Sequence, residues 1–112
     1  MNSEIVNHLK QKAFNLRKHV IEMVAMHGQG YVQQGLGASD LFSVLFFNEL
    51  TLDSDGSDHF ERDRFILSKG HAGAGVYATL AESGFFSKEK LKTHYQDGSY
   101  LSGHVSHKGI PG

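Results

Sequence analysis

The chain has 112 residues, of which 39% are hydrophobic and 21% charged, and its formal net charge at neutral pH is -1. This composition is too apolar for an intrinsically disordered chain and predicts one globular unit or part of one. Acidic and basic residues are nearly balanced and no basic run occurs, which excludes a nucleic-acid-binding stripe. The absence of cysteine excludes thiol catalysis and disulfides and favours a reducing cytoplasm. Frequent charges leave no signal-peptide core and no membrane span.

The first predicted element is a long amphipathic helix from Ser3 to about Met26. Its apolar residues recur at three- and four-residue steps, and Ser3 is the predicted N-cap. Gly28 and Gly30 are expected to end this helix because glycine disfavours its continuation. Residues 31–37 contain further glycines, so we predict a loop there.

A second predicted helix follows that loop. Ser39 is its expected cap, and its residues are apolar on nearly every side, which is typical of a helix in a core. The acidic run of residues 53–58 is predicted to be a surface loop. A calcium site is disfavoured there because Asp58 and Arg64 stand where an EF-hand loop has Gly and Glu.

The remaining elements indicate an α/β fold. Residues 65–67 are short and apolar, which predicts a buried strand leaving a parallel sheet. Residues 71–83 predict a helix stopped by Gly84, and Ser87 is the expected cap of a polar helix to about Tyr95. Because one strand cannot form a sheet, the other strands are expected elsewhere.

The predicted junction between strand and helix, residues 68–77, is a candidate binding site. Ligands of open α/β sheets bind at this edge, where backbone N–H groups and the helix dipole favour anions such as a diphosphate. Gly70 allows close approach of a ligand, and His71 can donate to a phosphate oxygen or exchange a proton. An ordinary turn followed by a capping histidine is the alternative interpretation of these residues.

A second candidate cluster lies near the end of the sequence. Gly103 and His104 stand in a polar loop, the kind of segment that carries function on a rigid scaffold, and His107 follows. No third ligand is spaced to complete a metal site with these histidines, so none is predicted. Three other histidines are predicted to be ordinary surface residues: His8, His19 and His94.

Residues 63–71, Asp-Arg-Phe-Ile-Leu-Ser-Lys-Gly-His, resemble the transketolase segment in which a strand leads to an active-site Gly-His and a helix. Gly103 and His104, followed by Ile-Pro-Gly at residues 110–112, are similar to the family's Gly-His-Pro loop and the Pro-Gly after it. Upstream, Leu-Gly-Ala-Ser-Asp at residues 36–40 resembles the family's Leu-Ser-Ala-Ala-Asp. The resemblance covers nearly the whole sequence.

The resemblance implies that residues 1–112 are a partial thiamine-diphosphate-binding domain, helix-rich with few parallel strands. The intact parent would transfer a two-carbon ketol unit from a ketose phosphate to an aldose phosphate in the cytoplasm. It would be a homodimer or be completed by a C-terminal subunit. The family's Gly-Asp-Gly segment, which holds Mg²⁺ and the cofactor diphosphate, has no counterpart here. No metal ligand is therefore assigned, and we expect a fragment that binds cofactor weakly or not at all by itself.

The resemblance also assigns roles to residues. His71 and His104 correspond to catalytic histidines, and Gly70 and His71 to cofactor-binding positions. Gly103, His104 and Tyr31 correspond to positions that contact substrate. Tyr31 departs from the family, which has a histidine there. Because a phenol titrates near about pH 10, proton shuttling at neutral pH would be lost at that position, and we expect an altered preference among donor ketoses.

Two alternative functions stay open. A deoxyxylulose-phosphate-synthase-like or dihydroxyacetone-synthase-like enzyme would share the cofactor and fold but differ in donor or acceptor. A non-catalytic helical interaction module, serving only to dimerise, is favoured by Tyr31 and by the missing magnesium segment.

Overall fold

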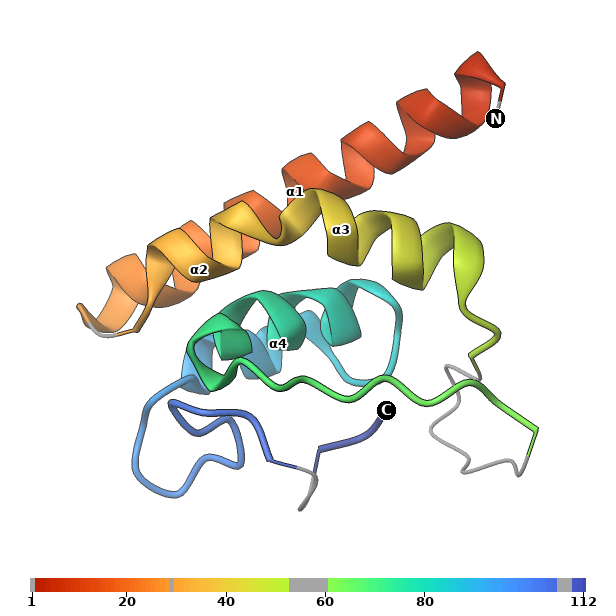
Figure 1. Cartoon of the computed structure of the whole chain (residues 1–112). Helices are drawn as coiled ribbons and strands as arrows, with labels where there is room; N and C mark the ends of the chain where they lie inside the picture. Colours follow the sequence, from red (N-terminus) through yellow and green to blue (C-terminus); the bar gives the residue numbers. More distant parts are fainter. Residues whose placement is uncertain (1, 29, 53–60, 107–109) are drawn as a thin grey trace.

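The computed structural model describes residues 2–28, 30–52, 61–106 and 110–112. Helices α1 and α3 lie on one side of the central helix α4, and the segment that ends the chain lies on the other side (Figure 1). The elements are α1 Ser3–His27, α2 Val32–Gly37, α3 Ser39–Val44, the π-helical turn η1 Leu45–Glu49, the 3-10 turn η2 Gly70–Ala72, α4 Gly73–Glu82 and the 3-10 helix η3 Lys88–Thr93.

Helix α1 confirms the first predicted helix, with a different cap. Asn2 is the N-cap, and its side-chain oxygen accepts a hydrogen bond from the Ile5 backbone N–H at 2.9 Å. The predicted cap Ser3 is instead the first helical residue. Gly28 ends the helix as predicted, in the left-handed conformation with φ 67°, and its N–H donates to the Val24 carbonyl.

The predicted loop at residues 31–37 is wrong, because Val32–Gly37 forms α2. Its glycines serve packing: a Cβ on Gly35 would lie 3.1 Å from Val20 of α1 and 3.3 Å from the backbone nitrogen of Gly75 in α4. The expected cap at Ser39 is also wrong. Ala38 is the N-cap, and Ser39 is the first residue of α3, where its hydroxyl donates to the Gly35 carbonyl at 2.8 Å.

The close approach of α2 and α4 at Gly75 gives a first prediction. A Cβ on Gly75 would lie 2.9 Å from Cε2 of Phe42 and 3.2 Å from the Gly35 Cα, so Gly75→Ala overpacks a buried contact. Overpacking costs about 1–3 kcal/mol, against a helix-propensity gain of about 1 kcal/mol. We therefore expect Gly75→Ala to lower the free energy of unfolding, measured by urea denaturation.

Gly37→Ala is the matched control for this prediction. A Cβ on Gly37 has no neighbour within 4 Å, so alanine at this helical position should stabilise the chain by about 0.5–1 kcal/mol. The difference between the two variants isolates the crowding at Gly75. Equal shifts of the denaturation midpoint in the same direction would contradict the packing argument.

The second predicted helix is present as α3 continued by η1. Only one side of it is buried in the core. Phe42 and Phe46 are buried, and each packs edge-on against the ring of Phe65, with centroids 5.9 and 5.1 Å apart. Leu41 on the outer side is 60% exposed. The core therefore forms where α3 and η1 meet α1, α4 and Phe65.

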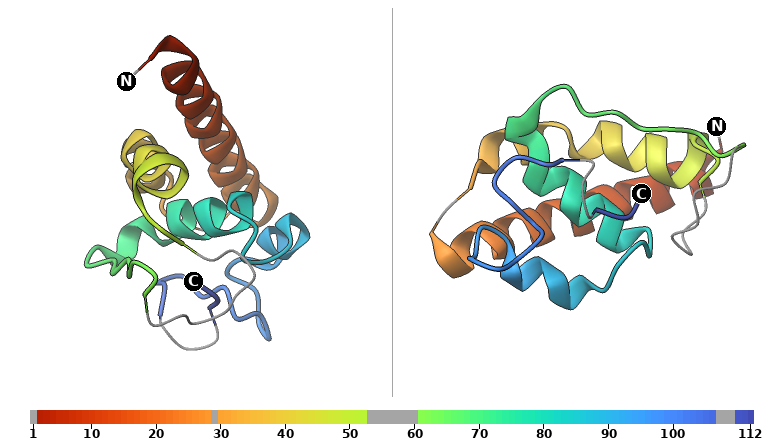
Figure 2. Two further views of the ribbon diagram at one scale, coloured as in Figure 1. Left: turned by 90° about the vertical axis from the view of Figure 1, so that its right-hand side faces the viewer. Right: turned by 90° about the horizontal axis from the view of Figure 1, so that it is seen from below.

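The predicted buried strand at residues 65–67 is not formed. Residues 61–69 run as an extended trace along α3 and η1 toward η2 (Figure 2), but no strand occurs among the described residues. Ile66 is 87% exposed, whereas its neighbour Phe65 packs against the core. Because a strand needs a paired neighbour, the α/β class is not confirmed by this part of the chain, which is helix-rich. The acidic run 53–58 lies outside the described residues.

The predicted helix at 71–83 is confirmed as η2 followed by α4, and Ser87 caps η3 by accepting from the Glu89 N–H at 3.2 Å. Glu82, at the end of α4, ties these elements to α1. Its side chain is 4% exposed and lies 3.6 Å from Lys12, 3.3 Å from His19 and 3.5 Å from Lys88. Burial alone would raise the pKa of Glu82, but the positive charges around it outweigh burial and lower that pKa.

Candidate functional site

Three of the residues singled out by sequence form one cluster of aromatic rings. Tyr31 comes from the turn before α2, His71 from η2 and His104 from the loop after η3. The ring centroids of Tyr31 and His71 are 4.4 Å apart, those of His71 and His104 4.9 Å, and those of Tyr31 and His104 5.7 Å. We call these three residues the ring cluster. The fold thus brings together three segments that are distant in the sequence.

The ring cluster lies at the surface. Both histidines are exposed and Tyr31 is half-buried. Exposed imidazoles can reach a ligand and can hold or release protons near neutral pH, while a phenol donates a hydrogen bond. The cluster therefore offers two groups suited to proton transfer and a hydrogen-bond donor on one accessible surface.

Two glycines allow the His104 loop to lie directly on η2 and α4. A Cβ on Gly70 would be 2.9 Å from Cδ2 of His104, and a Cβ on Gly73 would be 3.3 Å from the Val105 backbone nitrogen. The close approach predicted at Gly70 is therefore present, and the atoms that approach belong to His104. The absence of a side chain at Gly70 sets how near His104 comes to His71.

Gly103 supports the other side of the same loop. A Cβ there would lie 2.6 Å from Cζ of Tyr95, so the tyrosine ring rests directly on the glycine backbone. Tyr95 has a positive φ of 68°, which is uncommon for a residue other than glycine, and its N–H donates to the Leu101 carbonyl at 2.9 Å. The turn at Tyr95 thereby supports the backbone of residues 102–104.

Tyr77 of α4 holds the His104 loop from its buried side. Its side chain is fully buried, and its hydroxyl donates to the Ser102 carbonyl at 2.8 Å. Burial raises the pKa of Tyr77, more than the bond to Ser102 lowers it, so the phenol remains a protonated donor at neutral pH. Tyr77 thereby fixes the position of Ser102, two residues before His104.

The surface prediction for histidines is correct for His8, which is exposed, and wrong for His94. His94 is 1% exposed, and within the described residues neither ring nitrogen has a hydrogen-bond partner. His19 is half-buried beside Glu82. The spacing of His94 from Leu91 could have indicated burial, since side chains three apart share one side of a 3-10 helix and Leu91 is apolar. His107 lies outside the described residues.

The donors present suit the anionic end of a diphosphate cofactor. Two imidazoles and a phenol converge beside η2, which leads directly into the N-terminus of α4, and the first turn of α4 has no acidic residue. In the described part of the chain, no three His, Asp or Glu side chains gather into a possible metal site. The ring cluster therefore suits an anion, and the described residues supply no set of ligands for Mg²⁺.

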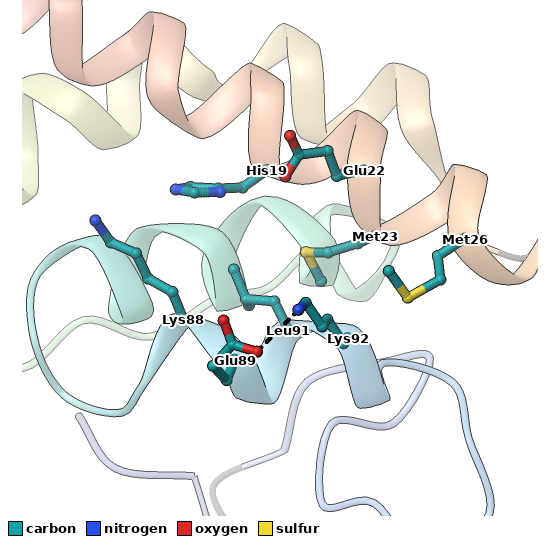
Figure 3. A pocket seen from close by; sticks show the side chains of 8 residues that line it. All are labelled: His19, Glu22, Met23, Met26, Lys88, Glu89, Leu91 and Lys92. Atoms are coloured by element: carbon teal, nitrogen blue, oxygen red, sulfur yellow. Dashed lines mark ion pairs between the residues drawn. The ribbon is translucent and has the colours of Figure 1, made fainter.

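A cavity of about 200 Å³ lies away from the ring cluster, between α1 and η3 (Figure 3). Met23 and Leu91 face it from opposite walls, and His19, Glu22 and Lys88 lie at its rim. None of its lining residues belongs to the ring cluster. Lys92 and Glu89 of its lining form an ion pair at 2.9 Å, and His19 and Lys88 pair with Glu82 outside the lining.

The described residues form a helix-rich fold with an exposed cluster of one tyrosine and two histidines, and the comparison with known proteins identifies its family. Residues 9–112 match the transketolase thiamine diphosphate binding domain, so the chain belongs to the transketolase family. A transketolase family protein of Sinorhizobium fredii is 37% identical over 93 residues, which cover 83% of this chain and 33% of that protein.

Two further relatives show the same relation. A 6-deoxy-6-sulfo-D-fructose transketolase subunit of a Clostridium species is 35% identical over 96 residues, covering 86% of this chain and 35% of the subunit. Human transketolase is 35% identical over 96 residues, which cover 86% of this chain and 15% of the human enzyme. The chain thus spans about a third of the length of the first two relatives. No helix among its described residues is long and apolar enough to cross a membrane.

Proposed function

We propose that the chain is the N-terminal portion of a thiamine-diphosphate-dependent transketolase that transfers a two-carbon ketol unit between sugar phosphates. The observation that carries the proposal is the ring cluster, in which His71 and His104 meet at an exposed surface beside α4. The relatives include transketolase subunits named for a sulfosugar and for apulose 4-phosphate, which supports a sugar substrate and assembly with a partner subunit. A homodimer in the cytoplasm is the other form that we consider.

The residues of the ring cluster have distinct tasks in this proposal. Bound thiamine diphosphate supplies the carbanion chemistry of ketol transfer. His71 binds near the cofactor diphosphate and holds or releases a proton, and His104 contacts the hydroxyl groups of the donor sugar. Tyr31 donates a hydrogen bond, and proton transfer is assigned to the two histidines, because imidazole is the usual proton-transfer group near neutral pH.

Two parts of the proposed enzyme are not found among the described residues. Oxygen ligands for Mg²⁺ are one part, since the described residues contain no candidate set. The other is the remainder of a parallel sheet, in which the extended segment around Ile66 would become a strand of an α/β domain. Residues 1–112 would then form a partial domain.

An interaction module without catalysis is the second candidate, and one observation favours it. Three large apolar side chains on the outer side of α1 and α3 are exposed: Phe14 at 61%, Ile21 at 51% and Leu41 at 60%. Such a group on neighbouring helices is typical of a surface that contacts another protein. This reading does not explain why two exposed histidines meet at the end of a glycine-rich turn.

Calorimetric titration of thiamine diphosphate with Mg²⁺ separates the two functions. We expect saturable binding to the intact enzyme, meaning this chain with its remaining sequence or complementary subunit, and weak or no binding to the chain alone. His71→Ala should weaken binding in the intact enzyme, and His8→Ala, a change at an exposed histidine of α1, should not. Absence of binding in both settings would support the interaction module.

A further inference from the structure

His94 occupies a position that packing alone does not explain. Its imidazole is 1% exposed, and neither nitrogen is hydrogen-bonded within the part of the chain that the structure describes. A buried polar group without a partner costs about 1–3 kcal/mol. A leucine or phenylalanine would fill the same space without this cost. The imidazole differs from them in that it can gain a proton, which makes the packing at this position depend on pH.

The neighbours of His94 lead to the ring cluster from two directions. A Cβ on Gly30 would lie 3.2 Å from Cε1 of His94, and Gly30 directly precedes Tyr31. On another side, the rings of His94 and Tyr95 meet edge-on with centroids 5.3 Å apart. Tyr95 in turn rests on Gly103, which directly precedes His104. One imidazole thus lies between the backbone segments that carry two members of the ring cluster.

We propose that His94 is a positioning residue of the ring cluster, whose uncharged ring holds the Gly30 turn and Tyr95 apart and so fixes how Tyr31 meets His104. The ring of Tyr77 closes the buried side, with its centroid 5.6 Å from that of His94. The proposal rests on the function proposed for the ring cluster. Its test measures the arrangement of the rings and needs no cofactor. The positioning role of His94 and the function proposed for the ring cluster can therefore be disproved separately.

Charge decides when His94 can hold this position. Among the described residues, the titratable groups that face it are His27 of α1, Tyr77 of α4 and Tyr95 of its own loop. Burial, and secondarily the charge of His27, lowers the pKa of His94 in the folded chain. Unfolded histidine binds a proton below about pH 6.5. The contribution of uncharged His94 to the free energy of unfolding is therefore complete above that pH and declines as pH falls below it.

Two variants and one control test the proposal in the full chain. His94→Phe keeps a buried ring without nitrogens, and His94→Ala removes the ring. Leu9→Ala is the control. Leu9 is also buried, but it lies in the N-terminal half of α1, far along the helix from His27, and its carbonyl accepts a hydrogen bond from Ser43. The readouts are the nuclear Overhauser contacts between the Tyr31 and His104 rings and the thermal midpoint, at about pH 7.5 and about pH 5.5.

In the unmodified chain, we expect the thermal midpoint to fall on moving to the lower pH. The Tyr31 to His104 contacts should persist in molecules that stay folded, because burial disfavours the charged ring. His94→Phe should retain these contacts at both pH values and show a smaller fall of the thermal midpoint. His94→Ala should lose the contacts even at the higher pH. Leu9→Ala should lower the midpoint and keep the contacts.

Three results would overturn the proposal. One is an unchanged Tyr31 to His104 contact in folded His94→Ala. Another is an equal loss of that contact in Leu9→Ala, which would make it a general effect of destabilisation. The last is the same pH response in His94→Phe as in the unmodified chain, which would assign the response to other histidines.

Discussion

In the proposed transketolase, replacing His71 or His104 by alanine should lower turnover by about 10²–10⁴-fold, the usual contribution of a positioned acid or base. Both rings are exposed at the surface, so the fold should tolerate the change. The measurement is the steady-state rate with saturating cofactor and donor, with thermal unfolding as a check on folding. His8→Ala, exposed on α1, should keep the full rate.

A conservative substitution separates binding from proton transfer at these positions. Asparagine in place of His104 can still donate a hydrogen bond but cannot carry a proton at neutral pH. If His104 only contacts the donor sugar, His104→Asn should raise KM and largely keep kcat. If it also transfers a proton, kcat falls in both variants. Full turnover in both alanine variants would remove the ring cluster from the mechanism.

Tyr77→Ala should have the largest effect on stability. The side chain is fully buried between α4 and the His104 loop and contacts the ring of His94, so its removal leaves a large cavity. Truncation of a buried aromatic residue to alanine costs about 3–5 kcal/mol, a large share of the stability of a small domain. Urea denaturation followed by circular dichroism measures the loss, and the alanine variant is expected to be largely unfolded at moderate urea.

Tyr77→Phe is the matched control for this prediction. It keeps the ring and removes only the hydroxyl that donates to the Ser102 carbonyl, which should cost about 0.5–1.5 kcal/mol. It should also loosen residues 102–104, detectable as faster amide exchange there than in α1. A phenylalanine variant as unstable as the alanine variant would mean that the hydrogen bond, and not the packed ring, holds the loop.

Local sequence signals predicted well the features that depend on neighbouring residues. The apolar period and Gly28 defined α1 to within a residue, and Ser87 was correctly expected to cap η3. The resemblance to transketolases selected Tyr31, His71 and His104, which the fold brings together although they are far apart in the chain. Whether they perform the proposed chemistry remains a prediction that the experiments above test.

Features that depend on contacts between residues far apart in the sequence could not be predicted from local sequence. The glycines before α3 were read as helix breakers, but Gly35 is needed for contact with α4, which stabilises α2. Residues 65–67 have the composition of a strand, yet no partner pairs with them in the described part of the chain. His94 was assigned to the surface because it is polar, and its burial follows from the turn at Gly30 and the rings around it.

The extended run around Ile66 has a consequence for handling the chain by itself. Among the described residues this extended backbone has no strand partner, and it carries an 87% exposed isoleucine, so it is a template for strand addition by a second molecule. The flanking charges of Asp63, Arg64 and Lys69, all exposed, act against such association as aggregation gatekeepers. Salt screens those charges. The isolated chain should therefore stay dispersed in dilute buffer more readily than at high ionic strength.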